Sequence, residues 1–190
     1  MEADWEIELG GGAPVIEPFW RGFVDLRFSP ESAHRLQEVA QLPRLAEVLI
    51  RLNAGGSPVW TSKCDVWSVD EFDPDELDSP REQALHAVAC YVDILPKGDQ
   101  QWATSAATTS WCRNICTILQ ACPMRCCRAD LVVRHAMLPP ERTEFGITAY
   151  VTACGPTPRS AFHVLAVALA ALADSITSGA SAETAAAKLQ

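Results

Sequence analysis

The stretch Arg125-Cys-Cys-Arg-Ala-Asp-Leu-Val-Val-Arg-His-Ala-Met137 decides how this chain is expected to fold. Every second residue of it is apolar or weakly polar, from Cys127 to Met137, whereas Arg128, Asp130 and Arg134 fall between them. This alternation is typical of an antiparallel strand that packs one side on a core and leaves the other side open. We therefore expect an open sheet face, and expect functional side chains on it.

Other segments repeat the alternation or show helical spacing. Further strands are predicted at residues 3–9, 22–28, 59–69, 86–95 and 145–154. Helices are predicted over 30–52, with an interruption at Pro43, and over 102–121 and 158–177. This order indicates an α+β two-layer sandwich, with a mostly antiparallel sheet of about five strands and helices on one face. The order βαββαβ of a ferredoxin-like sandwich is contained in it, extended by an extra strand and a C-terminal helix.

Length and composition are those of one globular domain. The chain has 190 residues, of which 48% are hydrophobic and 21% charged, values ordinary for a folded soluble protein. We expect a single α+β domain over residues 1–177. The remainder, 178–190, lacks periodic large hydrophobic residues and is predicted to be a flexible tail.

The charge of the chain restricts its partners. A formal net charge of -9 disfavours nucleic acid, whose phosphates are bound by lysine and arginine, and suits a basic protein. The first residues, Met-Glu-Ala-Asp-Trp-Glu, do not resemble a secretory signal. The longest apolar run, Ala161–Ala173, is shorter than the roughly 20 residues that a membrane span needs. A cytoplasmic protein without membrane contact is expected.

Four of the predicted strands each place one aspartate on the open face. These are Asp25, Asp65, Asp93 and Asp130. The same face is expected to carry four cations and four aromatic residues, namely Arg27, Lys63, Arg128, Arg134, Phe23, Trp67, Tyr91 and Tyr150. Three interpretations remain open: cross-strand ion pairs on a solvated sheet, a surface for protein binding or self-association, and a carboxylate site for metal binding or acid–base chemistry.

The cysteines and histidines favour core packing over chemistry. The spacing of the eight cysteines is not that of paired zinc ligands, and most of them fall on predicted apolar faces, although Cys122 and Cys126 remain unexplained. His86 and His135 are expected to face inward, and His163 to lie in a buried helix. Neither a phosphate-binding glycine loop nor a Gly-x-Ser-x-Gly turn occurs. No catalytic residue, metal ligand or cofactor is therefore predicted.

These observations favour a non-enzymatic protein-binding module. A specific hypothesis is an inhibitory or immunity-type protein that covers a basic, nucleic-acid-acting enzyme with its open face and the acidic loop at 70–78. The alternative is a metal-dependent hydrolase that uses the open-face aspartates. A third hypothesis is a structural protein that forms a homodimer through this face.

Overall fold

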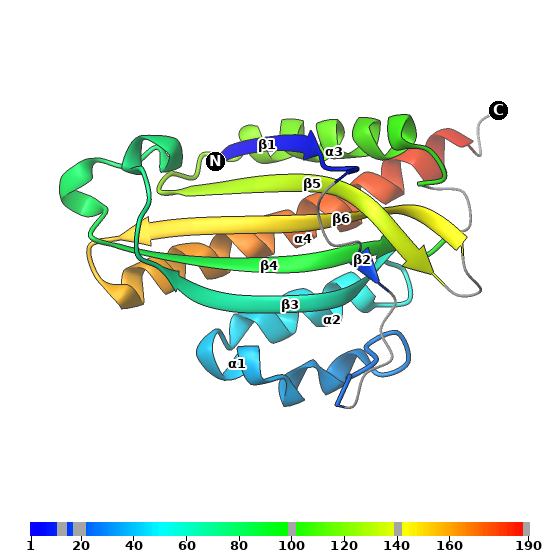
Figure 1. The fold of residues 1–190 in the computed structure, drawn as a ribbon, viewed down its shortest axis with the longest axis horizontal. Coiled ribbons are helices and arrows are strands. Elements are labelled where there is room, and N and C mark those ends of the chain that lie inside the picture. The colour runs from blue at the N-terminus through cyan, green and yellow to red at the C-terminus, as the bar shows by residue number, and fades with distance from the viewer. Residues whose placement is uncertain (11–14, 17–21, 99–101, 139–141, 188–190) are drawn as a thin grey trace.

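Two layers make up the molecule: a twisted β-sheet and a set of helices packed on one of its faces (Figure 1). This computed structural model describes residues 1–10, 15–16, 22–98, 102–138 and 142–187. The strands are β1 (Glu2–Ile7), β2 (Val15–Ile16), β3 (Val59–Val69), β4 (His86–Pro96), β5 (Cys127–Leu138) and β6 (Arg142–Gly155). The helices are α1 (Gln37–Gln41), α2 (Arg44–Asn53), α3 (Ser105–Gln120) and α4 (Pro158–Ala187), with short 3-10 helices η1 (Pro30–Arg35), η2 (Pro74–Leu77) and η3 (Arg81–Gln83). The predicted α+β class is confirmed.

The sheet is mixed, because one of its edges is parallel. The strands follow the order β1-β5-β6-β4-β3, and β2 pairs with β5 beyond the end of β1. The β3–β4, β4–β6 and β5–β6 pairs are antiparallel, whereas β1 and β2 run parallel to β5. Strands β3 and β4 form one antiparallel pair, and β5 and β6 form another. The two pairs join where β4 lies beside β6.

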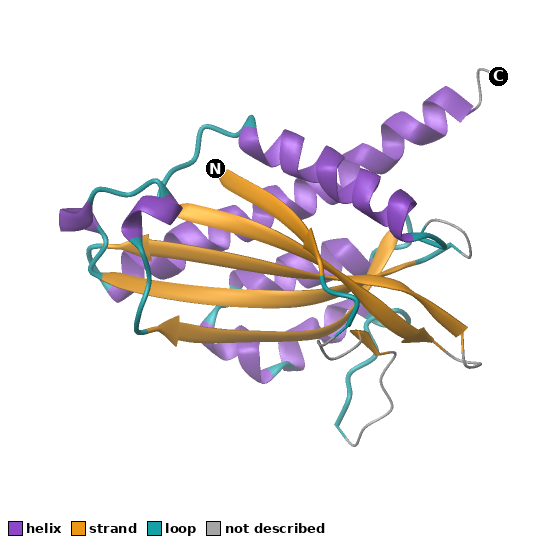
Figure 2. Ribbon diagram, turned by 45° about the horizontal axis from the view of Figure 1, so that its top comes forward, coloured by secondary structure: helices purple, strands orange, loops and turns teal. Residues whose placement is uncertain are grey.

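Helices α2, α3 and α4 cover one face of this sheet (Figures 1 and 2). Helix α4 packs on β6 and β4, α3 packs on β1, and α2 packs on β3 and α4. The inward strand positions are buried against them, as the alternation predicts; examples are Val92, Leu131, Val133 and Val151. Burial of each such side chain contributes about 2 kcal/mol, so this interface carries much of the stability of the fold.

Residues 22–28 are irregular, with turns at Gly22 and at 26–28, so the prediction of a strand there is wrong. The Asp25 carboxylate accepts a hydrogen bond from the Arg27 amide at 3.0 Å and another from Nη2 of Arg27 at 2.7 Å. A short acidic side chain that bonds an amide two residues ahead stabilises a turn in competition with strand pairing. Without a strand at this point the ferredoxin-like order βαββαβ is not found.

The helix predicted over 30–52 is divided into η1, α1 and α2. Leu36 has an extended conformation between η1 and α1, and Pro43 precedes α2. Proline lacks the amide that a continuous helix needs, so the expected interruption occurs. The Ser29 hydroxyl contacts that of Ser32 and does not cap a backbone amide.

A bulge in β3 changes which residues face the helices. The β3–β4 register shifts between Thr61 and Cys64, so Thr61 faces the helices and Trp60 lies on the opposite face. Strict alternation from Lys63 and Asp65 on the open face would instead place Thr61 on that face and Trp60 toward the helices. Asn53 at the end of α2 secures this arrangement: its Oδ1 accepts from the Thr61 amide at 3.0 Å and its Nδ2 donates to Thr61 Oγ1 at 2.7 Å.

Two small apolar clusters cover the ends of the sheet face opposite the helices. At one end Val15 of β2 packs with Trp60, Leu95 and Ala136. Gly146 lies directly beneath, since a Cβ added there would be 2.9 Å from the Cβ of Val15. Strand β2 approaches β6 this closely because Gly146 has no side chain.

At the other end, residues 70–85, which contain η2 and η3, fold over the sheet; we call them the 70–85 cover. Its Leu77 and Ala84 pack against Ala87 of β4 and Cys154 of β6. Between the two clusters, side chains of the described face such as Asp65 and Trp67 reach solvent.

Helix α4 is longer than the predicted 158–177. Its segment Pro158–Ser178 is long and apolar enough to span a membrane by length and composition, yet half of that segment is buried inside the fold. Burial on the sheet is typical of a core helix, and the structure is consistent with a soluble protein. The helix continues to Ala187, across most of the segment expected to be a tail; residues 188–190 lie outside the described residues.

Candidate functional site

The strand register aligns polar and aromatic residues in one row across the open face. Asp4, Asp130, Tyr150, Tyr91 and Asp65 are successive Cα partners from β1 through β5, β6 and β4 to β3. Residues that pair across neighbouring strands point to the same side of a sheet. The row therefore brings together four of the residues expected on this face, and adds Asp4 to them.

Aromatic side chains form a strip that crosses this row. The ring centroids of Trp67 and Tyr91 are 6.2 Å apart, and those of Tyr91 and Tyr150 are 6.0 Å apart. The strip continues to Arg134, whose Cζ lies 5.9 Å from the Tyr150 ring centroid and whose Nη2 is 2.7 Å from Oε2 of Glu8. We call Trp67, Tyr91, Tyr150 and Arg134 the aromatic strip.

The aromatic strip is neutral apart from its arginine. Burial raises the pKa of Tyr91 to about 12, and the nearby carboxylates of Asp93 and Asp65 add to the effect. The Tyr91 hydroxyl thus stays protonated at physiological pH and is able to donate a hydrogen bond. Trp67 is 37% exposed, so one ring of the strip offers apolar surface to a ligand.

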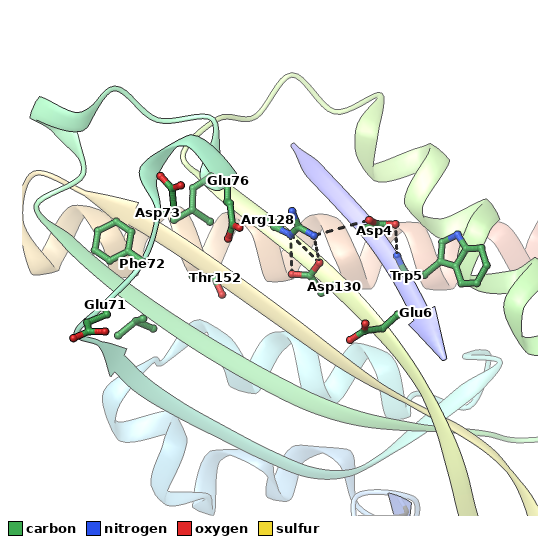
Figure 3. A pocket seen from close by; sticks show the side chains of 12 residues that line it. Asp4, Trp5, Glu6, Glu71, Phe72, Asp73, Glu76, Arg128, Asp130 and Thr152 are labelled. Carbon is green, nitrogen blue, oxygen red and sulfur yellow. Dashed lines mark hydrogen bonds and ion pairs between the residues drawn. The ribbon is translucent and has the colours of Figure 1, made fainter. Parts of the chain in front are cut away.

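A hollow of about 380 Å³ lies beside the strip, between β1, β5 and the 70–85 cover (Figure 3). Its lining includes six carboxylates and one guanidinium, namely Asp4, Glu6, Glu71, Asp73, Glu76, Asp130 and Arg128. Apolar side chains complete its wall, among them Phe72 and Leu77 of the cover. We call this cavity the acidic hollow.

Arg128 is already bonded within the acidic hollow. Its Nε donates to both carboxylate oxygens of Asp130, at 2.8 and 3.0 Å, and its Nη2 is 4.0 Å from Oδ2 of Asp4. The hydrogen bond to Asp130 raises the pKa of the Arg128 guanidinium. A partly exposed pair of this kind contributes at most about 1 kcal/mol. Glu76 on the opposite wall also attracts this guanidinium, through charge alone.

One further cation borders the hollow from the cover. Arg81 Nη2 is 2.8 Å from Oδ2 of Asp75 and 3.7 Å from Oδ1 of Asp73. Its closer contact is therefore with Asp75, which does not line the cavity. Clustered like charges at a partly enclosed surface concentrate the negative potential and attract cations.

The other two aspartates on the sheet face have separate local partners. Asp93 is buried, with 7% of its surface exposed, and its Oδ1 accepts a hydrogen bond from the Thr148 hydroxyl at 2.7 Å. Desolvation raises its pKa, although the bond from Thr148 and the charges of Lys63 and Arg134 oppose this shift. Asp65 is exposed and accepts a hydrogen bond from the Val66 amide at 2.7 Å.

Asp25, Arg27 and Lys63 do not join the row. Asp25 and Arg27 pair with each other in the turn, and the Cζ of Arg27 lies 4.4 Å from the ring centroid of Trp60. The pairing with Arg27 lowers the pKa of Asp25. Lys63 lies in the bulge of β3, where it lines a second hollow of about 440 Å³.

Ion pairing on the face is mostly local. Arg27 with Asp25 and Arg128 with Asp130 are pairs two residues apart along the chain, whereas Arg134 with Glu8 joins β5 to the end of β1. These contacts give partial support to the interpretation of the charges as surface ion pairs. They do not involve the carboxylates of Glu71 and Glu76.

Two histidines lie in more exposed places than expected. His86 and His163 are exposed, which corrects their predicted burial. His135 faces the helix side and stacks on Phe145, with ring centroids 5.6 Å apart. Within the described part of the chain, no three His, Cys, Asp or Glu side chains gather closely enough to hold a metal ion.

The sequence predicted part of the acidic hollow. Glu71, Asp73 and Glu76 belong to the acidic loop at 70–78 that was expected to take part in binding, whereas Asp4 and Glu6 of β1 were missed. A usable signal was present in Glu2-Ala-Asp-Trp-Glu-Ile-Glu-Leu9, where acidic and apolar residues alternate as on a half-buried strand. No comparable sequence pattern predicted that the 70–85 cover would lie over β5.

Compared with known proteins, the chain matches no protein-family model, no curated protein and no solved structure.

Proposed function

We propose that this chain is a non-enzymatic protein that binds a partner with a basic surface at the acidic hollow and the aromatic strip. The observation that carries the proposal is the concentration of six carboxylates around one cavity whose one guanidinium is already bonded to Asp130. A cavity of about 380 Å³ offers room for basic side chains from a partner. Lysine and arginine side chains are the protein groups that match such a lining.

The aromatic strip favours a protein as the partner over a small cation. Aromatic residues and arginine are enriched at the centres of protein interfaces, where they contribute much of the binding free energy. Trp67 and Tyr91 adjoin each other at 6.2 Å, and the open middle of the sheet connects the strip to the acidic hollow. A partner that inserted basic side chains into the hollow would cover the strip at the same time.

An inhibitory or immunity-type role is the more specific form of this proposal. Enzymes that act on nucleic acid present a basic surface to phosphates. A protein of net charge -9 that covered such a surface would block the substrate, and opposite charges would accelerate the encounter.

The test compares two variants that remove the same charge from different faces. Glu6→Gln with Glu76→Gln neutralises two exposed carboxylates of the acidic hollow, whereas Glu31→Gln with Glu47→Gln neutralises two exposed carboxylates on η1 and α2. The parent chain is immobilised, basic proteins are captured from native lysate at several salt concentrations, and each is then purified and titrated against all three chains. We expect the hollow variant to bind about tenfold more weakly, a loss of about 1.4 kcal/mol, and the matched variant to bind as the parent does.

Two results would contradict the proposal. One is that the parent retains no basic protein at any salt concentration. The other is that both double variants bind the captured protein equally well, which would mean that only overall charge attracts it.

A further inference from the structure

Two cysteines lie side by side where β5 begins and β6 ends. Cys127 is the ladder partner of Ala153, so Cys126 stands opposite Cys154 one step further along. The Cys154 amide donates to the Cys126 carbonyl oxygen at 2.9 Å, and Cys126 packs against the apolar cluster that contains Cys154. Opposed residues in antiparallel strands have Cα atoms about 4.5–5.5 Å apart, which lies inside the range of about 4.4–6.8 Å that a disulfide spans.

In three other pairs of neighbouring cysteines, the two residues do not face each other across antiparallel strands. Cys112 and Cys116 are both buried on one face of α3. Cys64 has Val92 as its ladder partner, so it is not opposed to Cys90. Cys127 belongs to the core beneath the helices, whereas Cys154 belongs to the cluster on the other face.

The two thiols differ in their access to solvent. Cys154 is fully buried beneath Leu77 and Ala84 of the 70–85 cover, and Cys126 packs at the border of the same cluster and is only partly buried. Burial raises the pKa of the Cys154 thiol. Cys126 also has a φ of 63°, a conformation that residues with side chains rarely adopt. A reagent from solvent is therefore expected to react with Cys126 before Cys154.

We propose that Cys126 and Cys154 are an oxidisable thiol pair that low-molecular-weight disulfides convert to an intramolecular disulfide. The Cys126 thiol loses its proton and attacks one sulfur of the reagent, which releases one thiol and leaves a mixed disulfide on Cys126. The Cys154 thiol then loses its proton and attacks the Cys126 sulfur, which forms the protein disulfide and releases the second thiol. The two protein thiols lose two electrons and two protons, and the reagent disulfide gains them.

The cross-link would form beneath one wall of the acidic hollow. Leu77 packs on the cluster that contains Cys154 and also lines the hollow. The bond joins the start of β5 to the end of β6 on the side that the cover occupies. Oxidation is therefore expected to raise the melting temperature, since a disulfide restricts the unfolded chain.

The experiment exposes the full chain to oxidised glutathione and maps its cysteines by proteolysis and mass spectrometry. The parent should acquire a Cys126–Cys154 cross-link that dithiothreitol reverses. Cys154→Ser should stop at a lasting glutathione adduct on Cys126, and Cys126→Ser should acquire neither adduct nor cross-link at this site. Cys122→Ser is the matched control, because Cys122 is also partly buried but its thiol contacts the Ile118 carbonyl at 3.6 Å; it should form the cross-link as the parent does.

Three outcomes would overturn the proposal: a parent that keeps the glutathione adduct without a cross-link, a parent with no modification at either residue, or a cross-link that persists in Cys126→Ser and so uses Cys127. If Cys154→Ser does not fold, the map of the parent and the behaviour of Cys126→Ser decide the question without it.

Discussion

At the scale of single residues, burial separates three of the aspartates on the open face, Asp65, Asp93 and Asp130. Asp65 is exposed and bonds the next amide, and Asp130 pairs with Arg128. Asp93 is the one of the three that the fold buries, with Thr148 as its hydrogen-bond donor. A carboxylate in that position is costly in its charged form, because removal from water favours the neutral acid.

Asp93→Asn should stabilise the protein at neutral pH and not at acid pH. Desolvation raises the pKa of Asp93 above the ordinary value of 3.8, so the folded state holds this proton more tightly than the unfolded state does. Stability therefore falls as the pH rises from the unfolded pKa through the folded one, and each unit of difference amounts to about 1.4 kcal/mol. The amide keeps the acceptor for Thr148 and avoids the buried charge.

Urea unfolding of the parent and of Asp93→Asn at pH 7 and at about pH 3 measures this difference. The variant should have the larger free energy of unfolding at pH 7, and the two should converge at acid pH. Asp70→Asn, which removes an exposed carboxylate, is the control and should change stability by less than about 0.5 kcal/mol. A variant that is less stable than the parent at pH 7 would show that the charged form of Asp93 is favoured by the fold.

At the scale of elements, side chains protect both edges of the sheet. On β1 the Trp5 amide donates to Asp4 at 2.8 Å, and the Ala3 carbonyl accepts from Gln120 of α3 at 2.8 Å. On β3 the Val66 amide donates to Asp65 at 2.7 Å. Edge groups bonded in this way are less available to a strand from another molecule. Asp4 and Asp65 thus have a structural role besides any part they take in binding.

Asn53 joins α2 to β3, and its replacement should loosen that connection. Asn53 is 2% exposed, and it bonds the Thr61 amide, the Thr61 hydroxyl and the Leu49 carbonyl. Asn53→Ala leaves the Thr61 groups buried without these partners, so it should lower the free energy of unfolding by about 2 kcal/mol. Asn114→Ala, at an exposed position of α3, is the control. Equal denaturation midpoints for both variants would mean that water replaces Asn53 at no cost.

At the scale of the whole molecule, charge determines which partner the open face accepts. A symmetric dimer through this face would place the acidic hollow of one copy near that of the other, because both copies use the same patch. Like charges brought together at an interface oppose association, and the chain already has a net charge of -9. A basic partner avoids this repulsion.

The free protein should therefore be a monomer. In size-exclusion chromatography at physiological salt, we expect the parent and Trp67→Glu to elute together at the volume of one chain. Trp67 is the most informative position because it is the exposed end of the aromatic strip. A dimer that Trp67→Glu dissociates would support instead the hypothesis of a homodimer through the open face.

The sequence by itself determined the elements whose pattern depends on one face being buried. The alternation in 59–69, 86–95, 125–137 and 145–154 and the spacing of α3 predicted the central strands and the helical layer, because burial selects apolar residues at fixed intervals. The prediction of a strand at 22–28 was wrong because the Arg27 amide donates a hydrogen bond to the nearby Asp25 carboxylate, and this local bond outweighs the alternation. Only the tertiary structure decided that β1 lies parallel to β5, that a bulge places Trp60 on the face opposite the helices, and that the 70–85 cover folds over the sheet. These features depend on contacts between residues far apart in the chain, and the acidic hollow, which joins β1, β5 and the cover, exists only through such contacts.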